Sequence, residues 1–186
     1  MNETAVLISI KPKWASLILS GKKTIEIRKT VPKLAPPLTC YIYESGTGCV
    51  VGEFVCDEID FGYEWYGEFV SLITGLHSPG FYEKSRIDAS TIWKYSKNKC
   101  FYTWHISSVM EYDEPLPLSD FCGLDGTPIK RPPQSWRYVK KAVRIIHADI
   151  SQVSSGTGRV DVALRQTPDG KAEMRVLNAI AETEDT

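Results

Sequence analysis

The first 28 residues alternate between apolar and polar positions in a way that predicts a strand, a helix and a second strand. Residues 5–10 (AVLISI) form a short apolar run that is typical of a buried strand. Residues 12–20 begin with proline and then carry apolar side chains at helical spacing, and Gly21 is a typical C-terminal cap. Residues 24–28 (TIEIR) alternate with a period of two, which predicts a strand with one apolar and one polar face.

The same patterns predict further elements up to about residue 150. Runs rich in β-formers indicate strands, and apolar side chains three or four positions apart indicate helices. On this basis we expect strands at residues 38–45, 50–59 and 100–112, a short helix near 69–73, a helix through Ser96 that is capped by Asp88 or Ser90, and a helix over 134–146.

A change of composition near residue 150 predicts a second region. Residues 151–158 (SQVSSGTG) are typical of a linker. Beyond them, a Pro-Asp-Gly turn at 168–170 separates two alternating runs and predicts a β-hairpin, followed by a frayed acidic end. We therefore expect one domain over residues 1–150 and an appended hairpin with an acidic tail over 151–186.

The composition of the 186 residues, 42% hydrophobic and 24% charged, is that of an ordinary soluble globular domain. No apolar run approaches the roughly 18–20 residues of a membrane span, and no secretory leader is visible, so we expect a cytoplasmic protein without a membrane partner. The five cysteines lack Cys-x-x-Cys spacing, which favours buried free thiols at Cys40, Cys49 and Cys56 over a metal site. Phosphate-loop and dinucleotide signatures are absent, and we expect no cofactor.

Charge is unevenly distributed although the formal net charge is −1. Residues 1–33 hold seven Lys or Arg against two acids, and residues 34–83 hold eight acids and no Lys or Arg. Residues 84–110 and 126–150 are again basic. The basic blocks either meet on one face, which would attract a polyanion, or belong to a mixed solvated surface.

One motif carries candidate chemistry. Gly21, Lys23, Glu26 and Arg28 match the pattern Gly-x-Lys-x-x-Glu-x-Arg directly after the first predicted helix. Here the chain resembles the ASCH domain family, a branch of the PUA-like superfamily. The resemblance extends over about residues 5–140, and flanking segments are also similar: SIKP at 9–12, VGEF at 51–54, WHIS at 104–107 running into 112–113, and RPPQSWRYV at 131–139, the last like the closing motif of a bacterial and phage subgroup.

The resemblance implies an α+β fold, a PUA-like, twisted and mostly antiparallel β-barrel with a few flanking helices, and a cleft that is lined by the motif and takes RNA or a nucleotide-like molecule. The candidate binding residues are Lys11, Lys23, Glu26, Arg28 and Trp136. A carboxylate accepts from an exocyclic amino group, a guanidinium grips a base edge or phosphate, and a lysine supplies a point charge. A ligand base also needs an aromatic side chain on which to stack, and the sequence does not decide between four candidates: Trp14, Trp65, Trp136 and Tyr138. The alternative for Glu26 and Arg28 is a structural ion pair.

Two other functions stay open at this stage. One ASCH branch resembles amidohydrolases that act on N4-acylcytidine and use a lysine, a threonine and a glutamate. Lys23 matches that lysine, but Glu26 occupies the threonine position and Thr24 lies about 6–7 Å away along a strand. Lys23 and Glu26 are therefore the candidate catalytic residues of a nucleoside or RNA hydrolase, without a decision that the protein is an enzyme. The third function is an interaction adaptor that uses the C-terminal hairpin; the oligomeric state stays open.

Overall fold

The computed structural model describes residues 4–141, 144–149, 158–166 and 172–181. The chain forms two compact units, Met1–Lys141 and Ala142–Thr186, each of which is described by itself. The predicted division into a domain over residues 1–150 and an appended region over 151–186 stays a prediction.

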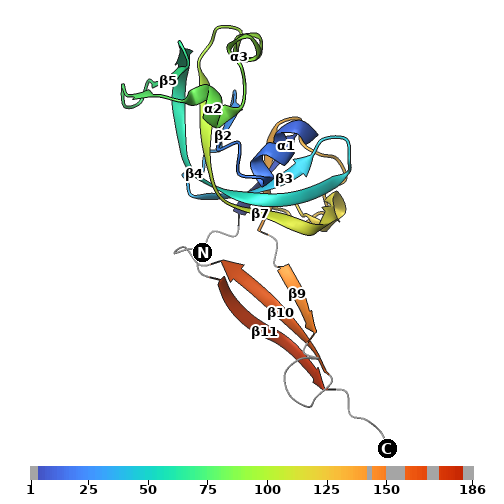
Figure 1. The fold of residues 1–186 in the computed structure, drawn as a ribbon. Coiled ribbons are helices and arrows are strands. Elements are labelled where there is room, and N and C mark those ends of the chain that lie inside the picture. Colours follow the sequence, from blue (N-terminus) through green and yellow to red (C-terminus); the bar gives the residue numbers. More distant parts are fainter. Residues whose placement is uncertain (1–3, 142–143, 150–157, 167–171, 182–186) are drawn as a thin grey trace, which may run out of the picture. The chain divides into compact units, whose positions relative to one another are not determined.

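The first unit is built on one strongly curved sheet (Figure 1). Neighbouring strands follow the order β2-β7-β4-β3-β1-β8, and two short strands, β5 and β6, extend from β4. Most pairs are antiparallel, whereas β1 and β3 are parallel. The bounds are β1 Thr4–Ile10, β2 Ile25–Arg28, β3 Leu38–Glu44, β4 Cys49–Trp65, β5 Glu68–Ser71, β6 His77–Ser78, β7 Phe101–Pro117 and β8 Trp136–Lys140. The predicted α+β class, with a mostly antiparallel sheet, is confirmed.

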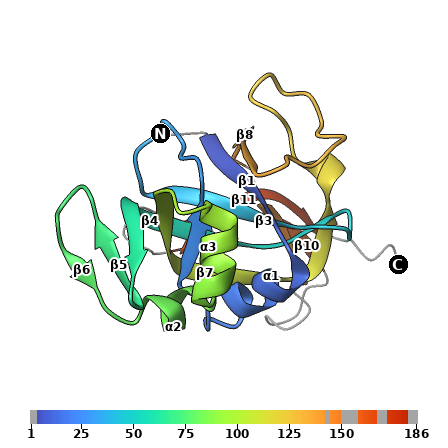
Figure 2. The same cartoon turned by 90° about the horizontal axis from the view of Figure 1, so that it is seen from above.

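Short helices flank this sheet. They are α1 Pro12–Leu19, α2 Phe81–Ser85, α3 Ala89–Ser96 and a 3₁₀ turn, η1 Leu118–Asp120. As predicted, α1 begins at a proline and is followed by Gly21 with a φ of 70°, and the Asp88 side chain caps α3 by accepting from the Thr91 N–H. Seen from above in Figure 2, α3 lies beside β2 and β7. None of the helices in the described part of the chain is long and apolar enough to cross a membrane.

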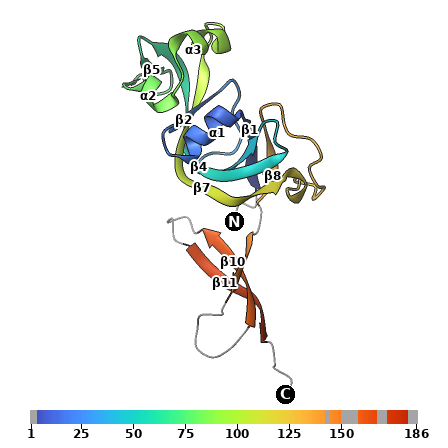
Figure 3. The same ribbon diagram turned by 45° about the vertical axis from the view of Figure 1, so that its right-hand side comes forward.

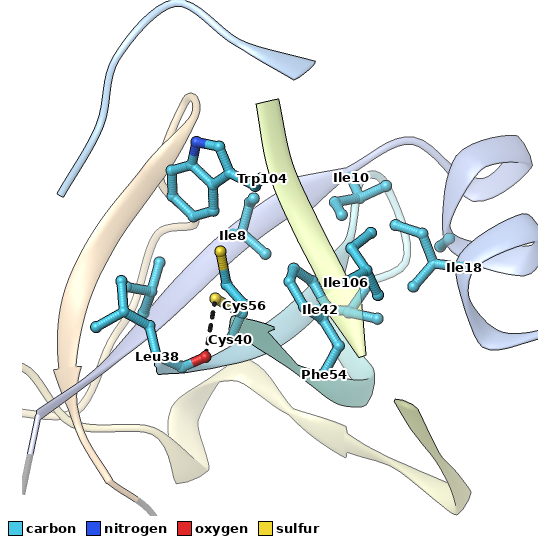
Figure 4. Close-up of a cluster of buried hydrophobic side chains, with 12 residues drawn as sticks. Ile8, Ile10, Ile18, Leu38, Cys40, Ile42, Phe54, Cys56, Trp104 and Ile106 are labelled. Carbon is cyan, nitrogen blue, oxygen red and sulfur yellow. Dashed lines mark hydrogen bonds between the residues drawn. The ribbon is translucent and has the colours of Figure 1, made fainter. Parts of the chain in front are cut away.

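The main hydrophobic core fills the concave side of the sheet beneath α1 (Figures 3 and 4). It combines side chains from β1, β3, β4 and β7 with Ala15 and Ile18 of α1. The indole of Trp104 is fully buried in it. Cys40 and Cys56 are buried in the same core, and burial raises the pKa of the Cys56 thiol to about 12. The prediction of buried thiols is confirmed for these two cysteines, and Cys49 is half-buried.

Side chains bridge the open side of the curved sheet, between the segment around β2 and the β1–β8 edge. The indole Nε1 of Trp136 donates to Thr30 Oγ1 at 2.9 Å. The Tyr138 hydroxyl oxygen accepts from the backbone N–H groups of Lys33, at 2.6 Å, and Leu34, at 3.2 Å. The two end strands, β2 and β8, do not pair with each other through their backbones. Hydrogen bonds from polar side chains connect this side of the sheet instead.

Two predicted helices are wrong. Residues 136–140 form β8, which pairs antiparallel with β1, instead of part of a helix over 134–146. The apolar spacing there suits a helix, but the free edge of β1 offers a complete hydrogen-bonding ladder, and a strand with Val139 buried takes it. Residues 68–71, close to the predicted helix at 69–73, form β5, which pairs with β4.

The second unit contains a three-stranded antiparallel sheet in the order β11-β10-β9. Its strands are β9 Arg144–Asp149, β10 Gly158–Gln166 and β11 Ala172–Ala181. The predicted hairpin is confirmed by the pairing of Leu164 with Met174 and of Val162 with Val176. Residues 151–157 of the predicted linker, the predicted turn and the acidic end lie outside the described residues, and residue 158 of that linker begins β10.

Candidate functional site

The motif strand β2 lies at the edge of the curved sheet and pairs only with β7. Ile25 and Ile27 pack into a small apolar cluster with Phe69, Phe81, Ile92 and Phe101. Glu26 and Arg28 project from the other face, as the period of two predicts. In the β2–β7 register Glu26 lies opposite Trp104. Two charged side chains are thereby placed against a buried part of the protein.

Lys23, Glu26 and Arg28 form one charged network. Lys23 Nζ lies 3.2 Å from Glu26 Oε2, and Arg28 Nη2 lies 3.1 Å from Glu26 Oε1. Each carboxylate oxygen thus has its own cationic partner. The side chains of Glu26 and Arg28 are each 10% exposed, and that of Lys23 is fully buried. The predicted assembly of the three residues exists, whereas an open cleft around them stays a prediction.

Lys23 is held on every side. Its Nζ donates to the carbonyl oxygens of Ile25, at 2.7 Å, and Ser85, at 2.6 Å, in addition to the contact with Glu26. An ammonium group has three N–H donors, so these three acceptors use all of them. Nζ also lies 5.4 Å from the centroid of the Trp14 ring. Burial lowers the pKa of Lys23, while the Glu26 carboxylate opposes that shift. The geometry makes Lys23 a fixed tie between β2 and the end of α2.

Arg28 extends the network to distant parts of the chain. Its Nη2 donates to the Ser9 carbonyl oxygen at 2.8 Å, and its Nη1 to Ser135 Oγ at 3.3 Å. Among the described residues, two buried side-chain donors on this face of β2 and β7 have no acceptor, Arg28 Nε and Trp104 Nε1. A buried donor without a partner is costly, so both mark positions where an acceptor would be stabilising.

An exposed lysine and an aromatic side chain, Lys29 and Tyr95, lie beside the network, and Lys11 is a further exposed lysine. Lys11 is exposed directly before α1. Lys29 follows β2, and its Nζ lies 4.7 Å from the centroid of the Tyr95 ring on α3. Burial raises the pKa of Tyr95, and the charges of Arg28 and Glu26 also act on it. Sequence reasoning did not identify Tyr95, because only tertiary packing brings α3 beside β2.

The aromatic candidates differ in their placement. Trp14 contacts Lys23, as described above. Trp136 is half-buried and packs against Trp104, with ring centroids 6.1 Å apart, and against Tyr138 at 5.4 Å. Trp65 ends β4 and contacts the neighbouring ring of Tyr66. The structure therefore links Trp14 and Trp136 to residues of the motif face, and it shows no such link for Trp65 among the described contacts.

One hollow of about 260 Å³ lies elsewhere in the first unit. It is lined by residues of α1, β4 and β7 and by the end of β3: Ser16, Leu19, Ser20, Glu44, Val51, Glu111, Tyr112 and Pro115. No residue of the motif lines it. Within the described ranges, no three His, Cys, Asp or Glu side chains gather closely enough to hold a metal ion.

Comparisons with known proteins agree with the motif. The family model described as "ASCH domain" matches residues 8–115. Among solved structures, the fold is similar to that of ASCH from Zymomonas mobilis, with a TM-score of 0.56, 21% identity, and coverage of 74% of this chain and 88% of that chain. A serine-to-alanine variant of the same protein matches with a TM-score of 0.57, 20% identity, and coverage of 75% and 91%. No curated protein sequence matches this chain.

Proposed function

Since the chain belongs to the ASCH domain family and has its PUA-like fold, we propose that it is an RNA-binding module whose ligand is held at the Glu26–Arg28 face. The observation that carries this proposal is the pairing of a carboxylate and a guanidinium 3.1 Å apart, each slightly open to solvent, on one strand face. Exposed Lys29 directly follows Arg28, and exposed Lys11 lies two residues after Ser9, whose carbonyl accepts from Arg28. Such a group suits a ligand that combines amino and carbonyl groups with phosphates, which is a nucleotide.

Each member of the network has a separate role in this proposal. Glu26 accepts from an exocyclic amino group of a base, and the Arg28 guanidinium, on a side chain that is 10% exposed, donates to a base carbonyl or phosphate oxygen. Lys23 holds the Glu26 carboxylate in place, because its Nζ lies 3.2 Å from Glu26 Oε2 and is itself held by the carbonyl oxygens of Ile25 and Ser85. Trp14 and Trp136 are the candidates for stacking, and Lys11 for a phosphate contact.

The geometry favours binding over hydrolysis. A general acid or base needs a proton that it can exchange with the substrate. Lys23 Nζ is fully buried, and its donors contact two backbone carbonyls and the Glu26 carboxylate, so they are engaged within the protein. Glu26 in turn is held between two cations. We therefore place the protein among ligand-binding modules.

The test is RNA affinity measured by fluorescence anisotropy as a function of salt. Glu26→Gln keeps the volume of the side chain and removes its charge, and Lys11→Gln removes a cation that makes no contact in the network. We expect Glu26→Gln to weaken binding of an oligonucleotide by roughly 10-fold or more, since a charge-assisted hydrogen bond contributes about 1.5–3 kcal/mol. Lys11→Gln should lower the salt slope by about 0.7.

Lys130→Gln serves as the control, because Lys130 is an exposed lysine in the loop before β8. Circular dichroism of each variant shows whether it is folded before its affinity is compared. A parent protein that binds no RNA at low salt would overturn the proposed function. If the folded Glu26→Gln variant binds RNA as tightly as the parent protein does, Glu26 is not part of the ligand site. Its role is then only structural, within the ion-pair network.

A further inference from the structure

A large aromatic side chain on α3 is turned away from the core. Ile92 and Ser96 of this helix are buried, which fixes the face that packs on the protein. Trp93 lies about 100° from Ile92 around the helix and is 65% exposed. An exposed indole offers a flat apolar face of large area with a polar N–H edge.

Three lysines follow Trp93 closely in the sequence. Lys94 follows it on α3, Lys97 lies one helical turn further on at the C-cap, and Lys99 follows the helix; all three are exposed. Residues 84–99 hold five Lys or Arg and one acid, Asp88, which is committed to capping α3. The end of α3 therefore combines an open aromatic ring with a concentrated positive charge.

One residue of α3, Tyr95, lies beside the proposed ligand face. Tyr95, on the same helix, lies under the Lys29 ammonium group, and Lys29 directly follows Arg28 on the chain. Arg28 and Glu26 are close enough to act on the pKa of the Tyr95 hydroxyl. Tyr95 and Trp93 lie about 200° apart around α3 with exposed Lys94 between them, so a chain that contacts Arg28 and Lys29 reaches Trp93 by crossing the exposed side of the helix.

We infer that α3 is a second contact site for single-stranded RNA, in which a base stacks on Trp93 and the flanking phosphates pair with Lys94, Lys97 and Lys99. The inference rests on the proposed function and extends it from one nucleotide at the Glu26–Arg28 face to a strand of several nucleotides. Stacking on an aromatic ring beside cationic side chains is the way in which proteins bind single strands without reading their sequence. The positive charge favours a polyanion over a protein segment with an apolar face.

The experiment compares two RNA probes on the full-length chain, a trinucleotide and a 12-nucleotide single strand. We expect Trp93→Ala to weaken binding of the 12-mer by roughly 5- to 150-fold, which corresponds to the loss of one stacked base. The triple variant Lys94→Gln, Lys97→Gln, Lys99→Gln should reduce the salt slope for the 12-mer by about 2. The trinucleotide is the probe for the Glu26–Arg28 face, and we expect its affinity to change less than 2-fold in both variants.

Two control variants match these changes. Trp65→Ala removes another exposed tryptophan, and the triple variant Lys130→Gln, Lys140→Gln, Lys141→Gln removes the same charge from exposed positions outside α3. If the α3 variants bind the 12-mer as the parent does, or no more weakly than their controls, the α3 site is overturned while the proposed function stands. If the parent binds neither probe, the proposed function fails and the α3 site fails with it.

Discussion

The Arg28 guanidinium donates a 2.8 Å hydrogen bond to the carbonyl oxygen of Ser9, and this contact joins β2 to β1 across the open side of the sheet. The two strands are not neighbours in the strand order. The same guanidinium neutralises Glu26. Arg28 therefore connects the fold and the candidate site, and its substitution should affect both.

Arg28→Ala should lower the free energy of unfolding by roughly 3 kcal/mol, because it breaks a nearly buried ion pair and leaves Glu26 with one cation. Arg28→Lys should recover part of that loss, since an ammonium group restores the charge but not the planar fork. Urea denaturation checks both values. Arg137→Ala removes an exposed arginine from β8 and should change stability by less than about 0.5 kcal/mol. If Arg28→Ala unfolds at the same urea concentration as the parent, Arg28 does not stabilise the contact between β2 and β1.

Lys23→Met should lower the free energy of unfolding by roughly 1–3 kcal/mol, because two buried backbone carbonyls then lose their donor. Methionine has a similar length, so the loss reports on the hydrogen bonds more than on volume. Lys22→Met at the exposed neighbouring position is the matched control. Equal chemical-denaturation midpoints for the two variants would show that the ammonium group does not hold β2 against α2.

The Asp88 cap should make stability depend on pH in the acid range. Hydrogen bonds from Ser90 and Thr91 hold the pKa of the Asp88 carboxyl well below its ordinary value. The folded state therefore favours the ionised form, so the stabilisation is present above the ordinary pKa of 3.8 and is lost as the pH falls towards the lowered value.

The measurement is the urea midpoint of the parent and of Asp88→Ser between pH 7 and about pH 2.5. Serine is also a good N-cap but does not titrate in this range. The difference in stability between parent and variant should shrink on acidification. A difference that is constant over the whole range would show that the carboxyl titrates at the same pH in the folded and unfolded chain.

Gly52→Ala should destabilise the first unit by roughly 1–3 kcal/mol through overpacking. A Cβ at this position of β4 would lie 2.5 Å from the Met110 carbonyl oxygen and 2.6 Å from Leu19 Cδ2. The backbone of β7 cannot yield as a flexible side chain would. Thermal unfolding measures the effect, with Gln134→Ala at an exposed position before β8 as the comparison. If Gly52→Ala melts at or above the melting temperature of the parent, the β7 backbone adjusts to the added Cβ without a loss of stability.

What the sequence determined is local. The proline at the first position of α1 and the glycine that follows the helix bound it, since a fixed φ and a positive φ act on single residues. The alternation in β2 put Glu26 and Arg28 on one face, because a strand has a period of two wherever it lies. The alternation alone therefore predicts that Glu26 and Arg28 form a charged pair.

Contacts between distant residues decided the rest. Lys23 is fixed by the carbonyl of Ser85, 62 positions away, and Arg28 by Ser135, 107 positions away, and no local pattern encodes either contact. The segment of Trp136 has helical spacing but became a strand, since the unpaired edge of β1 offered hydrogen bonds that a helix could not supply. Side-chain periodicity determines which residues share one face of a helix or strand. Which other residues that face contacts depends on burial and on the pairing of strand edges, and both depend on the whole chain.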